Sequence, residues 1–309
     1  MEYLLLVLTV GLGALKSIMT KLTKTKNTNL RDTTKINLIS FSCALVVIFL
    51  LGIQDLGSPF SVPIWLALFY AVCTLASQLC LMKAVELGPV SISSLFYSCG
   101  FIIPTIWGNV FYQEGIHALH IVGIVLIVAS FILSSQFKRG KRISIGWVFA
   151  ALGGTLFSGL VGVIQKLFTN NYSAFSLNYF LYVAFAFIIA INLLLFLVAQ
   201  IIDRRKKTVQ EPAPEEEITE EGEKTKTGRL ILFTIFLGCI IGLVNKINTY
   251  LSGVFPSIIV FPIINGGAIL LSAVLSKFIF KEKLKAIQWV GIMVGILGIV
   301  LLALGQMYV

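Results

Sequence analysis

The sequence has few charged residues. Only 12% of its 309 residues are Asp, Glu, Lys or Arg, about half the share found in ordinary soluble domains. Apolar and aromatic residues make up 57%, and a water-soluble fold of this length has too little core to hide them. These proportions exclude a soluble enzyme, a secreted disulfide scaffold, a nucleic-acid-binding domain and a disordered chain. An integral membrane protein is the class that remains.

Motifs for cofactors and metals are also missing. The five cysteines all lie inside apolar runs without a Cys-x-x-Cys pair, so neither zinc nor redox chemistry is indicated. No phosphate-binding Gly-rich loop occurs, which argues against ATP as the direct energy source. Glu114, His117 and His120 could share a helix face, but ordinary interfacial residues are the better interpretation. We therefore predict no cofactor and no metal.

Long apolar runs are abundant. A membrane-spanning helix needs roughly 20 apolar residues, and backbone in lipid must satisfy its own hydrogen bonds, so such runs form helices. We predict an all-α integral membrane fold within the lipid bilayer. Its ten transmembrane helices fall at about 2–20, 34–53, 62–84, 88–112, 117–136, 143–165, 178–201, 230–250, 254–280 and 286–308.

The basic residues are distributed unevenly. Of the 24 Lys and Arg, 21 lie in or beside the odd-numbered connections, whereas the even-numbered ones have only Lys166 and Lys246. Because basic loops stay on the cytoplasmic side, we predict cytoplasmic odd-numbered connections and outward-facing termini in the cell membrane. Clusters of this kind reflect topology and not a phosphate-binding face, so no nucleic-acid partner is expected.

One segment is polar. Residues 203–228 contain eight of the 14 acidic residues, and their low hydrophobicity predicts a disordered cytoplasmic insertion. A regulatory contact is one interpretation, and a solvated linker is the better one.

The two halves of the chain resemble each other. Glu114 and Glu282 are each followed nine residues later by a glycine, Gly123 and Gly291. Earlier in each half, Thr20-Lys21-Leu22 resembles Gln165-Lys166-Leu167. The sequence separation between Lys21 and Lys166 is shorter than that between Glu114 and Glu282, and the difference is about the length of the insertion. We predict two repeats of five helices, residues 1–138 and 139–309. Because five is odd, the repeats are inverted in the membrane, which is typical of transporters.

These matches, carried by residues 84–135 and 250–303 and by Lys21, resemble the EamA-like transporters of the drug/metabolite transporter superfamily. The resemblance implies a basket of ten helices in which the first, third, fourth, sixth, eighth and ninth surround a central cavity. It also implies export or exchange of small organic solutes. Some relatives have both termini in the cytoplasm, whereas the charges here predict the reverse.

Polar groups within the bilayer are costly and mark candidate functional sites. The helix predicted at 254–280 contains Pro262, Asn265, Gly266 and Gly267. Proline removes a backbone donor and glycine loosens the helix, so unpaired carbonyls could face a cavity beside the asparagine.

The equivalent place in the first repeat is also irregular. At the repeat offset, Asn265 and Gly266 fall on Tyr97 and Ser98, in a helix that contains Pro104. Two interrupted helices at equivalent positions predict a solute site near the middle of the membrane. The alternative is a kink whose small residues allow close helix packing.

Five further residues are candidate solute contacts. Asn245 and Asn248 are three apart and share a helix face, and Lys246 lies between them; Gln78 and Lys16 lie in the third and first predicted helices. A lysine in the cavity would prefer a carboxylate or phosphate. The alternative is a lysine that only anchors its helix at the interface.

The predicted helices contain no deeply placed Asp or Glu, so proton-for-cation antiport lacks a titrating carboxylate. Glu114 and Glu282 are expected to cap or anchor the turns before the fifth and tenth helices. We predict a secondary, alternating-access exporter or exchanger of a small polar metabolite, such as an amino acid or another anionic or zwitterionic solute. The alternatives are efflux of drug-like or lipid-linked compounds and, from another class, an integral-membrane enzyme or a scaffold.

Two Gly-x-x-x-Gly spacings allow close helix contacts, at Gly238 and Gly242 and at Gly291 and Gly295. Packing within the chain is the better interpretation, and a homodimer is the alternative.

Overall fold

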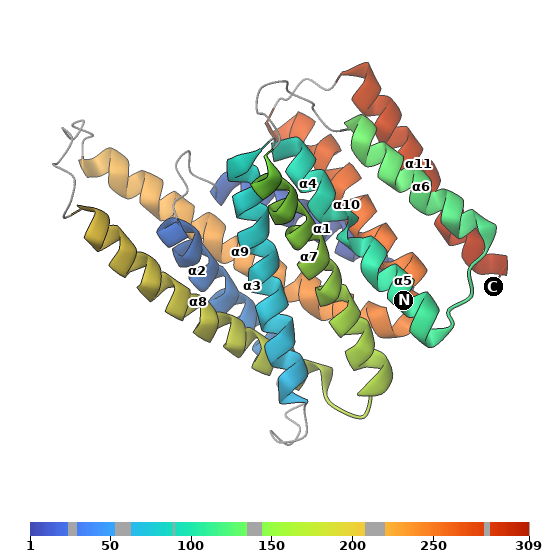
Figure 1. Cartoon of the computed structure of the whole chain (residues 1–309), viewed down its shortest axis with the longest axis horizontal. Helices are drawn as coiled ribbons and strands as arrows, with labels where there is room; N and C mark the ends of the chain where they lie inside the picture. Colours follow the sequence, from blue (N-terminus) through green and yellow to red (C-terminus); the bar gives the residue numbers. More distant parts are fainter. Residues whose placement is uncertain are drawn as a thin grey trace.

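The computed structural model describes residues 1–23, 30–52, 63–88, 90–134, 144–207, 220–280 and 285–308. These residues form helices and short connections, without a strand (Figure 1). The helices are α1 (Glu2–Thr23), α2 (Leu30–Gly52), α3 (Ile64–Leu87), α4 (Val90–Ser98), η3 (Cys99–Phe101), α5 (Ile102–Tyr112), α6 (Ala118–Ser134), α7 (Ile145–Asn171), α8 (Leu177–Lys207), α9 (Glu220–Val254), α10 (Ser257–Ile279), α11 (Ala286–Gly305) and η4 (Gln306–Tyr308).

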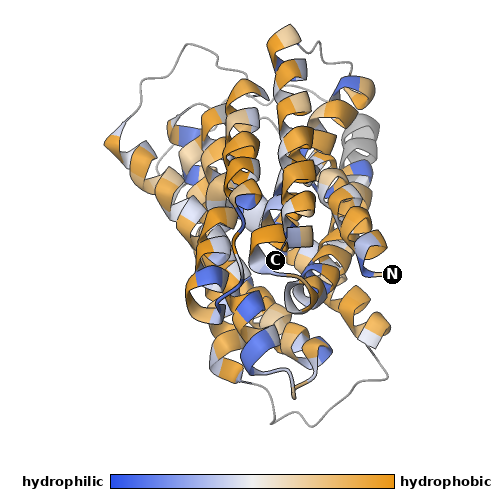
Figure 2. Ribbon diagram, turned by 90° about the vertical axis from the view of Figure 1, so that its right-hand side faces the viewer, coloured by the Kyte–Doolittle hydropathy of each residue, from blue (hydrophilic) through white to orange (hydrophobic). Residues whose placement is uncertain are grey.

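Each of the ten predicted apolar runs contains a helix among the described residues. Within the described ranges, nine spans are long and apolar enough to cross a membrane, with α4, η3 and α5 contributing one of them, and α6 is a shorter apolar helix. Hydrophobic residues dominate the helices (Figure 2). Large apolar side chains cover the outside, as at Leu4, Val110 and Phe149, which are 72%, 64% and 73% exposed. Such a surface is stable only against lipid, so the all-α membrane fold is confirmed.

The predicted insertion is helical at both ends. α8 continues to Lys207 and α9 begins at Glu220, so residues 203–207 and 220–228 differ from the disordered segment expected there. Once a helix has formed, each added residue gains a hydrogen bond at little extra cost, so a stable apolar helix extends into polar sequence. Residues 208–219 lie outside the described part of the chain, and their disorder stays a prediction.

The helices of one repeat pack as their equivalents in the other do. α6 packs along its equivalent α11, α2 along α8, and α5 along α10. α3 packs against α7, and the equivalent helices of the other repeat, α9 and α1, are also in contact. Likewise α1 packs against α10, and its equivalent α7 packs against α4 and α5, which together are equivalent to α10. Contacts that persist when the repeats are exchanged are expected for a pseudo-twofold arrangement.

The paired equivalents run antiparallel. Gly123, near the start of α6, packs against Gly298 and Leu302 in the second half of α11, whereas Ser134, at the end of α6, packs against Gly291 near the start of α11. α6 and α11 lie side by side at one edge of the bundle (Figure 1). Antiparallel equivalents are the arrangement that an inverted repeat requires.

Both Gly-x-x-x-Gly spacings face other helices of the same chain. A Cβ atom added to Gly242 would lie 2.8 Å from the carbonyl oxygen of Ala44 in α2, and one added to Gly291 would lie 2.9 Å from the Ser134 backbone nitrogen. These spacings therefore serve packing within the chain, and the homodimer stays a prediction.

We expect Gly242→Ala to destabilise the protein by about 1–3 kcal/mol, because the added methyl group must push the α2 backbone away. Gly11→Ala is the matched control: no atom lies within 4 Å of a Cβ added there, and alanine is the better helix former. The measurement is thermal unfolding of both purified variants in one detergent. Equal melting temperatures would contradict the packing role.

Candidate functional site

A network of polar side chains lies between α3, α7 and α9. The Tyr70 hydroxyl donates to Asn245 Oδ1 at 2.6 Å. Gln165 Nε2 donates to Thr249 Oγ1 at 3.0 Å, and Asn248 Nδ2 donates to Gln165 Oε1 at 3.2 Å. Tyr70, Gln165 and Thr249 are at most 1% exposed. We call these five residues the polar network; it joins the first repeat, through Tyr70, to the second.

One acceptor of the polar network is unused. Asn248 Oδ1 is buried and has no hydrogen-bond partner among the described residues. A buried oxygen left unpaired costs about 1–3 kcal/mol, so a bound group that carries an N–H or O–H donor would be stabilised there. The network therefore holds its helices together and keeps one buried acceptor without a partner among the described residues.

Local contacts fix the orientation of the polar network. Asn245 Nδ2 donates to the Ile241 carbonyl at 2.8 Å, and Thr249 Oγ1 donates to the Asn245 carbonyl at 2.8 Å. The Tyr70 ring packs edge-to-face on Phe180, with centroids 5.8 Å apart. Side chains held in this way are preorganised for binding.

A buried ion pair closes one end of the bundle beside the polar network. Lys166 Nζ lies 2.7 Å from Glu114 Oε1, and the two side chains are 5% and 10% exposed. Lys166 also donates to the Ser252 and Phe255 carbonyls at 3.0 and 3.2 Å, near the C-terminal end of α9. Glu114 Oε2 accepts the Ser257 backbone N–H at 2.6 Å. We call these five residues the clamp.

The local sequence positions Glu114 for this role. After α5, Gln113 adopts a left-handed conformation with φ of 51°, as residues that end helices often do. Asn109 Nδ2 donates back to the Glu114 carbonyl at 2.9 Å. The carboxylate then meets the first turn of α10, where the helix dipole favours a negative charge.

This geometry corrects the role expected for Glu114. Its carboxylate caps α10 of the other repeat and not the helix that follows it in the chain, because the turn at Gln113 directs it across the repeat boundary. It does not join a histidine cluster either: the backbone N–H of His117 donates to His120 Nδ1, while the Glu114 carboxylate contacts Lys166 and Ser257. The described residues contain no group of three His, Cys, Asp or Glu that could hold a metal.

The other candidates in α9 and α3 lie in different places. Asn245 and Asn248 belong to the polar network, whereas Lys246 Nζ donates to the Leu51 carbonyl near the end of α2 at 2.7 Å. Successive residues of a helix point in directions about 100° apart, which explains why Lys246 points to a different face of α9 from Asn245. Gln78 Oε1 accepts a hydrogen bond from Asn37 Nδ2 of α2 at 2.8 Å. Gln78 therefore bonds to α2 and not to the polar network.

Three further candidates form local or separate contacts. Asn265 Nδ2 donates to the Phe261 carbonyl of its own helix at 2.9 Å, and Ser98 Oγ donates to the Ser94 carbonyl at 2.7 Å. The Tyr97 ring packs against α7, where it lies 3.6 Å from a Cβ atom added to Gly154. The structure therefore does not bring Asn265 and Ser98 into the polar network.

Only one of the two predicted helix interruptions is present. The 3-10 turn η3 separates α4 from α5 and ends three residues before Pro104. α10 continues through Pro262 as one α-helix. Gly266 packs against Ile127 of α6, and Gly267 against Val10 of α1. Close packing is therefore the role that the structure shows for these two glycines.

Lys16 is partly buried in α1. Among the described residues its ammonium group has neither an ion pair nor a hydrogen bond. The clamp pairs Lys166 with Glu114, and Lys246 contacts a carbonyl. Lys16 is thus a lysine without an ion-pair or hydrogen-bond partner among the described residues of a membrane helix, and such groups are candidate functional sites.

Sequence reasoning missed Tyr70, Gln165 and the ion pair. Gln165 and Lys166 stood out only as a repeat match, although a glutamine within an apolar helix is itself a signal of function. Tyr70 is one of nine tyrosines and carries no distinguishing pattern. Its role depends on the register between α3 and α9.

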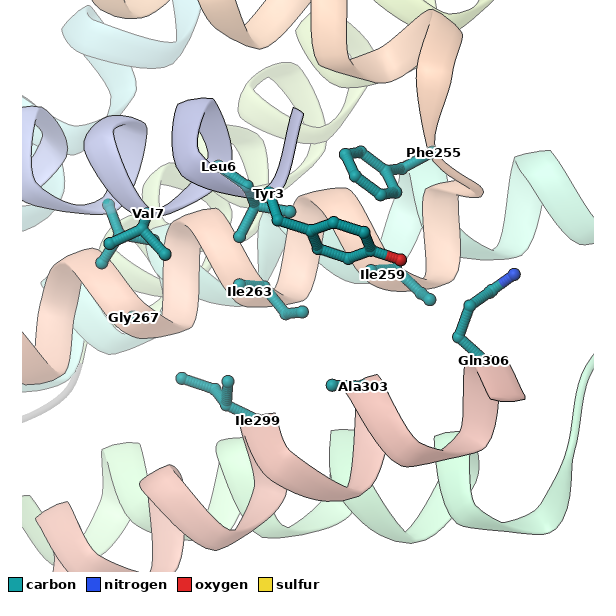
Figure 3. Close-up of a pocket in the computed structure, with 11 residues that line it drawn as sticks. Tyr3, Leu6, Val7, Phe255, Ile259, Ile263, Gly267, Ile299, Ala303 and Gln306 are labelled. Carbon is teal, nitrogen blue, oxygen red and sulfur yellow. The ribbon is translucent and has the colours of Figure 1, made fainter. Parts of the chain in front are cut away.

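An apolar groove lies between α1, α10 and α11 (Figure 3). It has a volume of about 310 Å³. Polar side chains in it are Tyr3, whose ring contacts Phe255 at a centroid distance of 5.1 Å, and Gln306, whose Oε1 has no hydrogen-bond partner among the described residues. Of the predicted site residues only Gly267 lines it. The groove is separate from the polar network and suits an apolar molecule.

Comparisons with known proteins account for both halves. The model of the EamA-like transporter family matches residues 2–136 and 145–304. No curated protein matches the chain. One solved crystal structure, described only as that of a protein, superposes with a TM-score of 0.72 at 12% identity, covering 99% of this chain and 98% of that one; this likeness shows the fold alone. With two family units along one multi-pass membrane chain, the protein belongs to the EamA-like transporter family of the drug/metabolite transporter superfamily.

Proposed function

We propose that this EamA-like protein is a secondary transporter that moves a small polar metabolite by alternating access, as an exporter or exchanger. The observation that carries the proposal is the polar network, which is built on three helices long and apolar enough to span a membrane, joins the two repeats and keeps the acceptor Asn248 Oδ1 without a partner among the described residues. Members of the family are transporters and not enzymes, which supports transport over catalysis or a scaffolding role.

Alternating access is supported by the arrangement of the repeats. Antiparallel equivalents such as α6 and α11 allow the two repeats to exchange conformations, which exposes a shared site to either side in turn. The basic residues of the odd-numbered connections support placing these connections on the cytoplasmic side of the cell membrane. Both termini and the clamp would then lie on the outer side.

The charge balance supports an anionic or zwitterionic solute, such as an amino acid. Lys16 would supply a positive charge, since no protein partner of its ammonium group is found among the described residues, and Asn248 would supply an acceptor for an ammonium or hydroxyl group. A carboxylate would offset the cost of holding the Lys16 charge away from water. Asn245, Tyr70 and Gln165 would contact the polar groups of a solute bound at the polar network.

The direct test is counterflow in proteoliposomes with a panel of labelled amino acids, other carboxylates, phosphate esters and organic cations. We expect accumulation of at least one anionic or zwitterionic solute without ATP. Transport confined to organic cations would contradict the assigned solute class, and binding without transport of any panel member would contradict the function.

We expect Lys16→Met to lower uptake of the identified anionic solute about tenfold, because about 1.4 kcal/mol of charge interaction is lost. Lys246→Met is the control: its contact with the Leu51 carbonyl lies apart from the network, so uptake should stay within about twofold. Initial rates at equal protein incorporation check both. A larger loss for Lys246→Met than for Lys16→Met would place the cation site elsewhere.

A second function is favoured by the apolar groove. A drug-like or lipid-linked compound could lie between α1, α10 and α11 and enter from the bilayer, since Tyr3 and Val7 are 68% and 66% exposed on that face. The effect of Gly267→Leu on efflux of an apolar dye and on amino-acid counterflow distinguishes the two functions. A variant that no longer exports the dye but still transports amino acids would support the second function.

A further inference from the structure

We infer that the clamp, together with the α7–α9 contact beside it, is the outer gate of the transport path and is closed in this structure. This rests on the proposed alternating-access function and assigns the gate to Glu114, Lys166 and the α9–α10 junction.

The clamp joins the repeats at one end of the bundle. Glu114 belongs to the first repeat, whereas Lys166 and the α9–α10 junction belong to the second. One lysine donates to two carbonyls near the end of α9, and one carboxylate accepts from the first turn of α10. The two repeats therefore cannot separate at this end without breaking the ion pair.

The contacts between α7 and α9 continue from the clamp to the polar network. Thr169 Oγ1 and Ser252 Oγ lie 3.4 Å apart, Lys166 donates to the Ser252 carbonyl, and Gln165 donates to Thr249. Ser252 and Thr249 are fully buried. The gate thus lies directly outside the proposed solute site and shields it from water on that side.

The equivalent contact in the other repeat is not formed to the same extent. α7 packs against α9, whereas α1 and α3, their repeat equivalents, do not pack closely within the described residues. In an inverted repeat the α1–α3 contact would close the opposite end. The asymmetry is the one expected for a transporter that is closed on the outer side.

A buried ion pair suits a gate because its two states are closely balanced. In the closed state the charges are dry but paired; in the open state each is solvated by water, and the cost of desolvation roughly cancels the attraction. Neutralising one member leaves the closed state with an unpaired buried charge, so the equilibrium moves toward the open state. Glu114→Gln does this while keeping the size of the side chain and an oxygen acceptor for the Ser257 N–H.

The first experiment measures access to a cysteine behind the gate. Thr249→Cys in a background without the five native cysteines is labelled with a membrane-impermeant maleimide, in intact cells and in inverted vesicles. We expect Glu114→Gln to raise the labelling rate from the cell exterior about tenfold. The matched control is Glu86→Gln, which breaks the exposed Lys83–Glu86 pair within one helix and should leave the rate unchanged.

The second experiment measures closure directly. Thr169→Cys/Ser252→Cys places two sulfur atoms where the hydroxyls are 3.4 Å apart, so a mild oxidant should cross-link α7 to α9. We expect Glu114→Gln to slow this about tenfold. If Glu114→Gln changes neither exterior labelling nor cross-linking, the clamp is not a gate. Neither readout needs a transported solute, so this outcome is separate from failure of the proposed function.

Discussion

Lys166→Met is expected to destabilise the protein by about 3–5 kcal/mol, the cost of removing one partner from a buried ion pair. Methionine keeps the length and apolar stem of the side chain, so the loss measures the charge and its hydrogen bonds. Glu114 would remain 10% exposed without its counter-charge, and the Ser252 and Phe255 carbonyls would lose the donor that Lys166 supplies. Both effects act in a low-dielectric interior, where an unpaired group is expensive.

The measurement is thermal and denaturant unfolding in detergent. Glu114→Gln/Lys166→Met should be closer to wild type than Lys166→Met, because the double variant has no unpaired charge. Lys83→Met is the control, since the Lys83 and Glu86 side chains are 55% and 61% exposed and such pairs contribute little. Equal destabilisation by Lys166→Met and Lys83→Met would mean that the buried pair contributes no more to the free energy of unfolding than the exposed pair does.

Gln165→Leu is expected to reduce transport about 100-fold, because a site built on hydrogen bonds loses heavily when buried groups are left unpaired. Gln165 donates to Thr249 and accepts from Asn248, so its removal leaves both without a partner in the network. Leucine preserves most of the volume, which separates the loss of hydrogen bonds from the loss of packing.

The measurement is the initial counterflow rate per correctly inserted molecule. Gln288→Leu is the matched control: Gln288 is also a buried glutamine, 5% exposed, but it donates to the Ser134 carbonyl between α11 and α6, away from the network. It should lower stability and leave the rate per molecule within about twofold. Wild-type rates for Gln165→Leu would place the solute elsewhere in the bundle.

Composition determined most of the architecture. Ten apolar runs sufficed for the helices, because backbone in lipid has few alternatives to helical hydrogen bonding. The Glu–Gly and Lys-Leu matches were enough to reveal the two repeats, since equivalent turns and helix ends need equivalent residues. The ends of the polar segment at 203–228 were missed because a stable helix propagates past its apolar part.

The candidate site was predicted only in part. Asn245 and Asn248 could be placed together, because their spacing alone fixes a common helix face. Asn265 and Ser98 were chosen for their position in irregular helices, yet both side chains bond to a carbonyl one turn earlier. A polar side chain in an apolar helix has that local partner within reach whatever the rest of the fold does.

By itself the sequence determined that this protein is a helical membrane bundle of two related halves, with its basic residues gathered at alternate connections. Only the tertiary structure decided that Tyr70, Gln165 and Asn245 meet, and that Glu114 finds Lys166 across the repeat boundary. The physical reason is that helix formation in lipid depends on local composition, whereas contacts between helices depend on their rotation and register, which the packing of many side chains sets jointly.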